Sequence, residues 1–172
     1  MKRLLLLRHA KSRWDEPRLD DFDRPLAPRG IAAAPRVARE MHRLGLLPDL
    51  VLCSTATRAV ETWHLVAREL PGERPVERLR DLYMASPAAL LKRFRQAPDE
   101  ADCLLAVGHN PGLEALALRL ATPGSDREAL ARLRQKFPTA ALTVFEVAAG
   151  SWADLGDGTA RLTAFIRPRE LE

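Results

Sequence analysis

The stretch Leu4-Leu5-Leu6-Leu7-Arg8-His9-Ala10 joins four consecutive leucines to an arginine and a histidine. A short run that is wholly apolar is typical of a strand buried on both faces, as the strands of parallel sheets are. In open α/β sheets, ligands bind beyond the carboxyl ends of the strands. We therefore expect Arg8 and His9 to lie at the ligand-binding edge of such a sheet.

Two further apolar runs lead into polar segments in the same way. Residues 50–53 precede Ser54-Thr55-Ala56-Thr57-Arg58, and residues 103–107 precede Gly108-His109-Asn110-Pro111-Gly112. Because the carboxyl ends of parallel strands share one edge, side chains about 100 residues apart in the sequence should meet there. The four side chains that we expect in one crevice are Arg8, His9, Arg58 and His109.

The rest of the chain alternates short apolar runs with longer amphipathic segments. We expect strands over about 4–7, 50–53, 76–79, 103–107, 141–147 and 160–166. We expect helices over about 28–44, 58–70, 87–96, 111–120 and 125–136. Pro35 should kink the first helix or mark its true start, and Gly45 should end it.

This alternation predicts one domain over residues 1–172 with a three-layer α/β/α architecture. The sheet should be mainly parallel, have about five to six strands and carry helices on both faces. The last two strands should form a hairpin-like pair that adds an antiparallel strand at an edge of the sheet.

Composition excludes several classes of protein. The chain has 172 residues, is 47% hydrophobic and has a net charge of +4, which fits one globular domain. Aromatic residues make up only 5% and do not alternate with basic ones, which argues against nucleic acid as a partner. No apolar run is long enough for a membrane span or a signal peptide. Cys53 and Cys103 lie inside apolar runs, as buried thiols do, so we expect a cytoplasmic protein.

The expected crevice suits phosphoryl transfer. Two guanidinium groups offer forked donors that match a phosphoryl dianion. A neutral imidazole can attack phosphorus, and a second imidazole, if protonated, can stabilise the equatorial oxygens. The spacing of His, Cys, Asp and Glu does not indicate a metal site, so we expect no metal and no cofactor. A histidine after a strand can also be structural, but the combination of three such strand ends favours function. His42 and His64 lie on expected helices without such a strand end, and we take them as surface or packing residues.

These motifs resemble those of the histidine phosphatase superfamily, which includes phosphoglycerate mutase and the acid phosphatases. Arg8-His9-Ala10-Lys11-Ser12, Asp23-Arg24-Pro25-Leu26 and Arg29-Gly30 are most similar to the short SixA-type branch, as are Leu82-Tyr83 and His109-Asn110-Pro111-Gly112. The resemblance implies a phosphoglycerate mutase-like fold and a metal-independent phosphatase that acts on phosphohistidine in signalling proteins. It implies His9 as the phosphorylated nucleophile, a phosphate clamp of Arg8, Arg58 and His109, and Ser12 near the phosphate.

The sequence leaves open which residue acts as the general acid. Larger relatives place a glutamate after a Leu-Arg-like pair, whereas Asp81 follows Leu79-Arg80 here. Asp81 is a shorter general acid, an electrostatic neighbour of the arginines or a turn residue, and Glu77 is a weaker substitute. The imidazole of phosphohistidine leaves more readily than an alkoxide, so the aspartate mildly favours a P–N substrate.

Two loop residues also have open roles. Asp15 falls where larger relatives have asparagine, so its contact with phosphate is in doubt. Arg24 either lines the entrance and steers anions or pairs with one of its acidic neighbours, Asp20, Asp21 and Asp23.

Three hypotheses for the function follow. The first is a phosphatase for protein phosphohistidine, and the second is a phosphatase or mutase for small phosphomonoesters. The third is a non-catalytic module that binds phosphorylated partners, which two histidines and two arginines disfavour. Only one helix fits between residues 79 and 103, so we expect an open crevice without a lid, which admits a phosphorylated protein or a small phosphomonoester.

Overall fold

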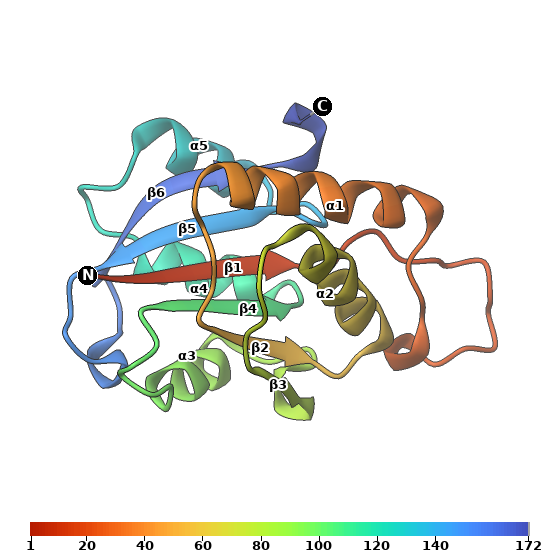
Figure 1. Cartoon of the computed structure of the whole chain (residues 1–172), viewed down its shortest axis with the longest axis horizontal. Coiled ribbons are helices and arrows are strands. Elements are labelled where there is room, and N and C mark those ends of the chain that lie inside the picture. Colours follow the sequence, from red (N-terminus) through yellow and green to blue (C-terminus); the bar gives the residue numbers. More distant parts are fainter. Residues whose placement is uncertain (172) are drawn as a thin grey trace.

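Six strands form one mixed sheet in the computed structural model, which describes residues 1–171 (Figure 1). The strands are β1 (Lys2–Arg8), β2 (Leu50–Ser54), β3 (Val76–Leu79), β4 (Cys103–Gly108), β5 (Leu142–Val147) and β6 (Ala160–Ile166). Their order across the sheet is β3-β2-β4-β1-β5-β6. The first four strands are parallel, β5 is antiparallel to β1, and β6 pairs antiparallel to β5 at the edge. The predicted mainly parallel sheet and the antiparallel pairing of the last two strands are confirmed. The strand that runs against the others is β5, one position in from the edge, whereas the edge strand β6 runs in the direction of β1.

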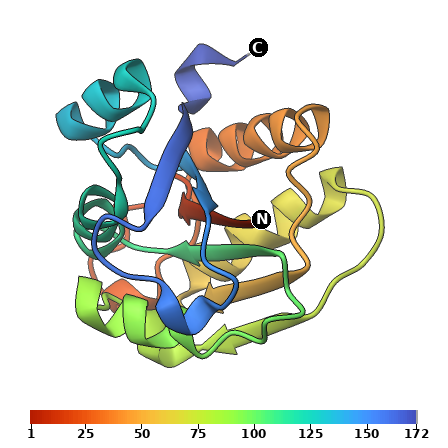
Figure 2. The same cartoon turned by 90° about the vertical axis from the view of Figure 1, so that its left-hand side faces the viewer.

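Within the described residues, five α-helices cover the two faces of this sheet. They are α1 (Pro28–Arg43), α2 (Thr57–Glu69), α3 (Pro87–Arg95), α4 (Gly112–Leu120) and α5 (Arg127–Gln135). Figure 2 shows α1 and α2 on one side of the sheet and α3, α4 and α5 on the other. The three-layer α/β/α architecture is therefore the one that the sequence predicts.

The leucine run of β1 supplies both cores. Leu4 and Leu6 pack with residues of α3, α4 and α5, whereas Leu5 and Leu7 pack with residues of α1 and α2. Successive side chains of a strand point to opposite faces, so an unbroken apolar run is required where both faces are covered. This explains why β1 lies in the interior of the sheet.

The first helix begins where the sequence predicts and excludes one of the two roles expected for Pro35. The helix begins at Pro28, a favoured first position for proline, and continues through Pro35 to Arg43. Pro35 is therefore not the start of the helix. Gly45 ends the helix as predicted, with a φ of +69° that a residue without a Cβ adopts readily.

The register of the parallel strands brings their polar ends together. Arg8 at the end of β1 pairs with Gly108 at the end of β4, so His9 and His109 follow at the same level. Cys53 of β2 pairs with Val107 on the other side of β4, which brings Ser54 to the same edge.

Candidate active site

The two histidines lie side by side at the carboxyl edge of the sheet. Their ring centroids are 5.2 Å apart, and the residues are 6% and 3% exposed. Nε of Arg58, from the start of α2, lies 3.3 Å from Nε2 of His9. A pocket of about 210 Å³ opens beside them, and its lining also includes Arg8, Ser12, Trp14, Asp21, Arg24, Met84, Asn110 and Thr139. The structure thus brings together the four side chains that the strand ends predict.

Hydrogen bonds define which nitrogen of His9 is free. Nδ1 lies 2.7 Å from the carbonyl oxygen of Ala10, which can only accept a hydrogen bond. The proton of the neutral ring is therefore on Nδ1, and the lone pair is on Nε2, toward which Nε–H of Arg58 donates. Burial lowers the pKa of His9 to about 3, and the charges of Arg58 and Arg8 act in the same direction. His9 is therefore a neutral imidazole near pH 7.

His109 is also neutral in the free protein. Burial, followed by the charge of Arg58, lowers its pKa to about 3. Nε2 lies 2.8 Å from Oγ of Ser54, and the ring of Tyr83 packs edge-on with its centroid 5.3 Å away. Nδ1 is buried and has no hydrogen-bond partner among residues 1–171. A bound dianion would raise this pKa, because it offsets the positive charge that helps to keep the ring neutral.

An aspartate that the sequence offered only as a possible partner of Arg24 lies at the centre of the site. Asp21, in the short turn η1 (Asp21–Asp23), accepts hydrogen bonds from Arg58, Arg24 and the hydroxyl of Tyr83. Burial alone would raise the pKa of Asp21, but these hydrogen bonds outweigh it and hold the pKa well below its usual range. Asp21 is therefore an ionised acceptor that neutralises two buried arginines, and Arg24 both lines the pocket and pairs with a neighbour.

Two residues of α2, Glu61 and Thr62, join the parts of the site. Oγ1 of Thr62 accepts a hydrogen bond from N–H of Ala10 at 2.9 Å and donates to the carbonyl of Arg58 at 2.7 Å. Glu61 accepts a hydrogen bond from N–H of Leu26, at the end of the loop that carries Asp21. Sequence reasoning gave these residues no role, because their partners lie far away in the sequence. Their position one turn after Arg58 was the available signal.

The remaining predicted residues separate into two groups. Ser12 is buried, lines the pocket and accepts a hydrogen bond from Arg24. Asp15 pairs with Arg13 on the exposed part of the loop and does not line the pocket.

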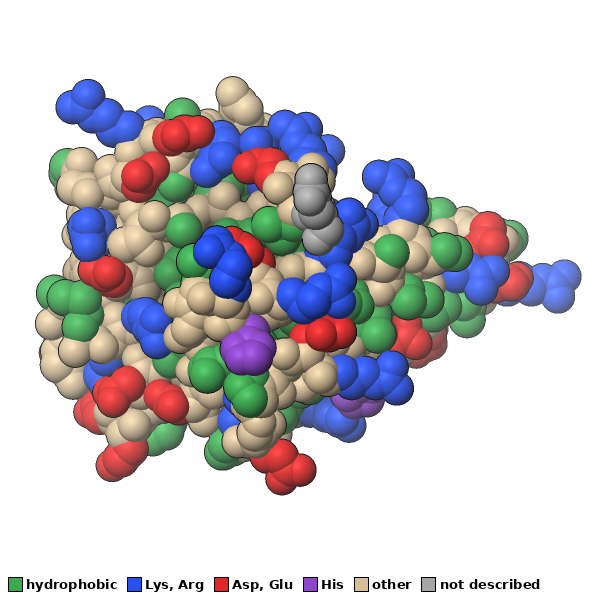
Figure 3. All heavy atoms as spheres, turned by 45° about the horizontal axis from the view of Figure 1, so that its top comes forward, with side chains coloured by type: hydrophobic (Ala, Val, Ile, Leu, Met, Phe, Trp, Pro, Cys, Tyr) green, Lys and Arg blue, Asp and Glu red, His purple; other side chains and the backbone are tan. Residues whose placement is uncertain are grey.

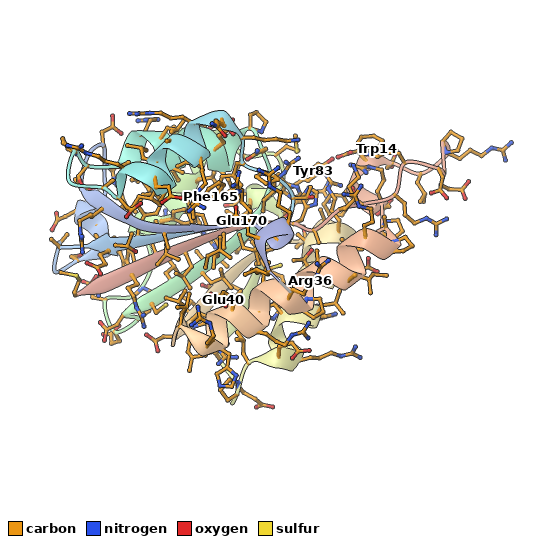
Figure 4. The ribbon with its side chains drawn as sticks, turned by 90° about the horizontal axis from the view of Figure 1, so that it is seen from above. Trp14, Arg36, Glu40, Tyr83, Phe165 and Glu170 are labelled. Carbon is orange, nitrogen blue, oxygen red and sulfur yellow. The ribbon has the colours of Figure 1, made fainter. Side chains whose placement is uncertain are left out.

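Asp81 also lies apart from the pocket lining. It is exposed in the turn η2 (Arg80–Leu82), and Glu77 is exposed on β3. The turn buries Leu82 and packs Tyr83 against His109 instead. Figure 4 shows Tyr83 and Trp14, from two separate segments, on the side of the molecule where the strands end.

Two further findings concern the described part of the chain as a whole. No group of three or more His, Cys, Asp or Glu that could hold a metal ion occurs in the described part of the chain. None of the helices within residues 1–171 has the length and apolar character needed to cross a lipid bilayer.

Comparisons with known proteins agree with this geometry. The family model described as histidine phosphatase superfamily (branch 1) matches residues 4–86, which contain Arg8, His9 and Arg58. An uncharacterized protein of Mycobacterium tuberculosis is 41% identical over 164 residues, which cover 95% of this chain and 100% of that protein.

Two solved structures are similar over nearly the whole chain. A proposed phosphohistidine phosphatase SixA from Agrobacterium tumefaciens has a TM-score of 0.81 at 31% identity, covering 97% of this chain and 98% of that chain. Its counterpart from Nakamurella multipartitia has a TM-score of 0.82 at 29% identity, covering 97% of this chain and 96% of that chain. The sheet and its five helices form a phosphoglycerate mutase-like fold. The chain belongs to branch 1 of the histidine phosphatase superfamily and is similar in structure to SixA proteins.

Proposed function

We propose that this protein removes the phosphoryl group from phosphohistidine in another protein, through a covalent phosphohistidine on Nε2 of His9. The observation that carries this proposal is the hydrogen bond from His9 Nδ1 to the carbonyl of Ala10. It directs the lone pair of a neutral ring to Nε2, the nitrogen beside Arg58. A buried, neutral imidazole with a fixed tautomer is ready to act as a nucleophile.

The first step transfers the phosphoryl group to His9. Nε2 attacks phosphorus, and the bond between phosphorus and the substrate nitrogen breaks. When the other nitrogen of the substrate ring carries a proton, the electron pair returns to a ring that leaves as neutral imidazole. No acid then needs to protonate it. Arg8 and Arg58 stabilise the charge on the equatorial oxygens, as a metal ion does in other phosphoryl transfer enzymes.

The second step releases the product. A water oxygen attacks phosphorus, the bond from phosphorus to Nε2 breaks, and both protons of the water stay with the phosphate that forms. His9 returns to its neutral form with its proton on Nδ1. Ser54 can donate its hydroxyl hydrogen to Nε2 of His109, which leaves the His109 proton on Nδ1, an atom without a hydrogen-bond partner within residues 1–171.

The carboxylates near the pocket favour a P–N substrate over a phosphomonoester. An alkoxide leaving group needs a positioned acid. Asp21 lines the pocket, but its hydrogen bonds keep its pKa far too low for an acid near neutral pH. Asp81 is exposed and does not line the pocket. The similarity to proteins proposed as phosphohistidine phosphatases adds support.

The test compares His9→Ala with His42→Ala, which changes an exposed histidine of α1. We expect the wild type to hydrolyse a phosphohistidine peptide faster than a phosphoserine peptide or p-nitrophenyl phosphate. His9→Ala should lose at least about 10³-fold in rate, whereas His42→Ala should retain the wild-type rate. An acid-labile phosphoryl adduct should be trapped on the wild type and not on His9→Ala. A wild-type rate in His9→Ala, or a preference for the phosphomonoesters, would contradict the proposal.

A further inference from the structure

A basic groove adjoins the pocket that contains His9. It has a volume of about 580 Å³ and lies between the N-terminal half of α1, the segment 135–139 before β5, and residues 167–169. All the charged residues that line it are basic, namely Lys11, Arg29, Arg36, Lys136, Arg167 and Arg169. Figure 3 shows lysine and arginine side chains gathered on the face of the molecule that presents α1 and the C-terminal segment.

The charge of the basic groove is mostly uncompensated. Arg167 pairs with Glu170, but the other five basic residues form no ion pair with a carboxylate within residues 1–171. The chain as a whole has 27 basic and 23 acidic residues, so acidic side chains are plentiful elsewhere. Like charges that share a groove repel one another, and soluble proteins usually mix both signs on their surfaces. This arrangement suits a site for an anionic ligand.

The basic groove is continuous with the catalytic pocket. Lys11 and Thr139 line both, and Lys11 follows His9 by only two positions with an exposed side chain. The pocket itself has a volume of about 210 Å³, which holds a phosphoryl group and a part of the group that carries it. The remainder of a large substrate must therefore lie outside the pocket, and the basic groove lies directly beside it.

We infer that the basic groove binds a carboxylate-rich segment of the phosphorylated protein whose phosphohistidine enters the pocket, an inference that rests on the proposed function. Arginine side chains pair with carboxylates through two parallel hydrogen bonds, which suits Arg29, Arg36 and Arg169. The lining contains no aromatic side chain on which a nucleic acid base could stack. The basic groove therefore fits an acidic protein segment better than a nucleic acid.

The test reverses charge in the basic groove without touching the catalytic residues. Arg29→Glu with Lys136→Glu changes two exposed positions, and a glutamate at Arg29 suits the first turn of α1. Lys92→Glu with Arg127→Glu is the matched control, because both residues are exposed and neither lines the basic groove. Arg29→Ala with Lys136→Ala is a milder second variant, and thermal unfolding checks that all variants fold.

Two readouts separate the basic groove from the catalytic site. The first is kcat/KM for two phosphohistidine peptides, one flanked by aspartate and glutamate and one flanked by serine and glutamine. We expect the wild type and the control to prefer the acidic peptide by about tenfold at low salt. Arg29→Glu with Lys136→Glu, the groove variant, should lose that preference. Hydrolysis of the neutral peptide should be the same in all three proteins.

The second readout is binding of a fluorescent, unphosphorylated acidic peptide, which needs no catalysis. We expect the groove variant to bind it at least about tenfold more weakly than the wild type and the control. If the wild type fails to hydrolyse phosphohistidine but the charge-dependent binding persists, the proposed function is wrong, whereas the binding of an acidic segment by the basic groove is supported. Equal binding by the groove variant, or tighter binding of an oligonucleotide of equal charge, would overturn the inference.

Discussion

At the scale of single residues, the site depends on which groups carry charge before a substrate arrives. Two neutral imidazoles lie among three arginines that line the pocket, and Asp21 is the carboxylate in that lining. Arg58 is only 3% exposed, so its charge needs a partner, and Asp21 supplies one at 2.9 Å. A phosphoryl dianion that enters the pocket would take over part of this role. Asp21 therefore resembles the ligand in charge, although it belongs to the protein.

The burial of Arg58 and Arg24 beside Asp21 predicts the behaviour of Asp21→Asn. The variant leaves Arg58 and Arg24 buried without a carboxylate, so its free energy of unfolding should fall. We expect a loss of about 1–2 kcal/mol, which is less than for a fully buried pair because the Asp21 side chain is 43% exposed. Orthophosphate should raise the melting temperature of Asp21→Asn more than that of the wild type, because the anion restores the missing charge. Thermal unfolding with increasing phosphate measures both effects.

Asp15→Asn is the control for this prediction. Asp15 pairs with Arg13 on the exposed surface of the same loop, and exposed ion pairs contribute little to stability. Its phosphate response should equal that of the wild type. If Asp21→Asn unfolds like the wild type and responds no more strongly to phosphate, Asp21 does not neutralise the buried arginines.

At the scale of elements, the strand ends were predictable and the contacts that hold them were not. The apolar runs of β1, β2 and β4 identify the strands, and parallel pairing then brings His9, Arg58 and His109 together. Thr62 and Asp21 act through hydrogen bonds to segments far away in the sequence, and no local pattern encodes such pairings. Which face of a helix is buried depends in the same way on the segments that the helix contacts.

Gly30 shows how closely α1 approaches the catalytic loop. A Cβ at Gly30 would lie 2.2 Å from the carbonyl oxygen of Lys11, two residues after His9. Alanine favours the helix by about 1 kcal/mol over glycine, but the clash is with backbone, which cannot rotate away as a side chain can. We expect Gly30→Ala to lose about 1–3 kcal/mol of stability and to lower kcat, because Lys11 and His9 must shift together. Urea unfolding and steady-state kinetics measure the two effects.

Gly124→Ala provides the comparison for Gly30→Ala. A Cβ there would meet only Oγ1 of Thr122, at an ordinary contact distance of 3.7 Å. Its stability and activity should stay close to those of the wild type. Full stability and full activity in Gly30→Ala would show that α1 and the loop can separate without cost to the site.

At the scale of the whole molecule, the sheet joins distant segments into surfaces that no single segment encodes. The basic groove combines α1, the segment before β5 and the C-terminal turn, so the arginine content of the sequence did not reveal it. The catalytic pocket was easier to predict, since each of its main residues follows a recognisable strand. The same fold that assembles the pocket also buries His9 and His109, which connects catalysis to the stability of the whole chain.

That connection predicts how stability depends on pH. An imidazole in the unfolded chain binds a proton below about pH 6.5, whereas burial lowers the pKa of His9 and His109 to about 3 in the folded protein. Above pH 6.5 the two states bind equal numbers of protons at these sites, and the full stability is present. As the pH falls below 6.5, the unfolded state binds up to two more protons than the folded state. The free energy of unfolding should then fall by about 1.4 kcal/mol per pH unit for each histidine.

Urea unfolding in phosphate-free buffer between about pH 7 and 5 measures this slope, and His9→Ala should show about half of it. A wild-type stability that stays constant over this range would mean that the two rings take up protons inside the folded protein, and the neutral nucleophile would then lose its physical basis.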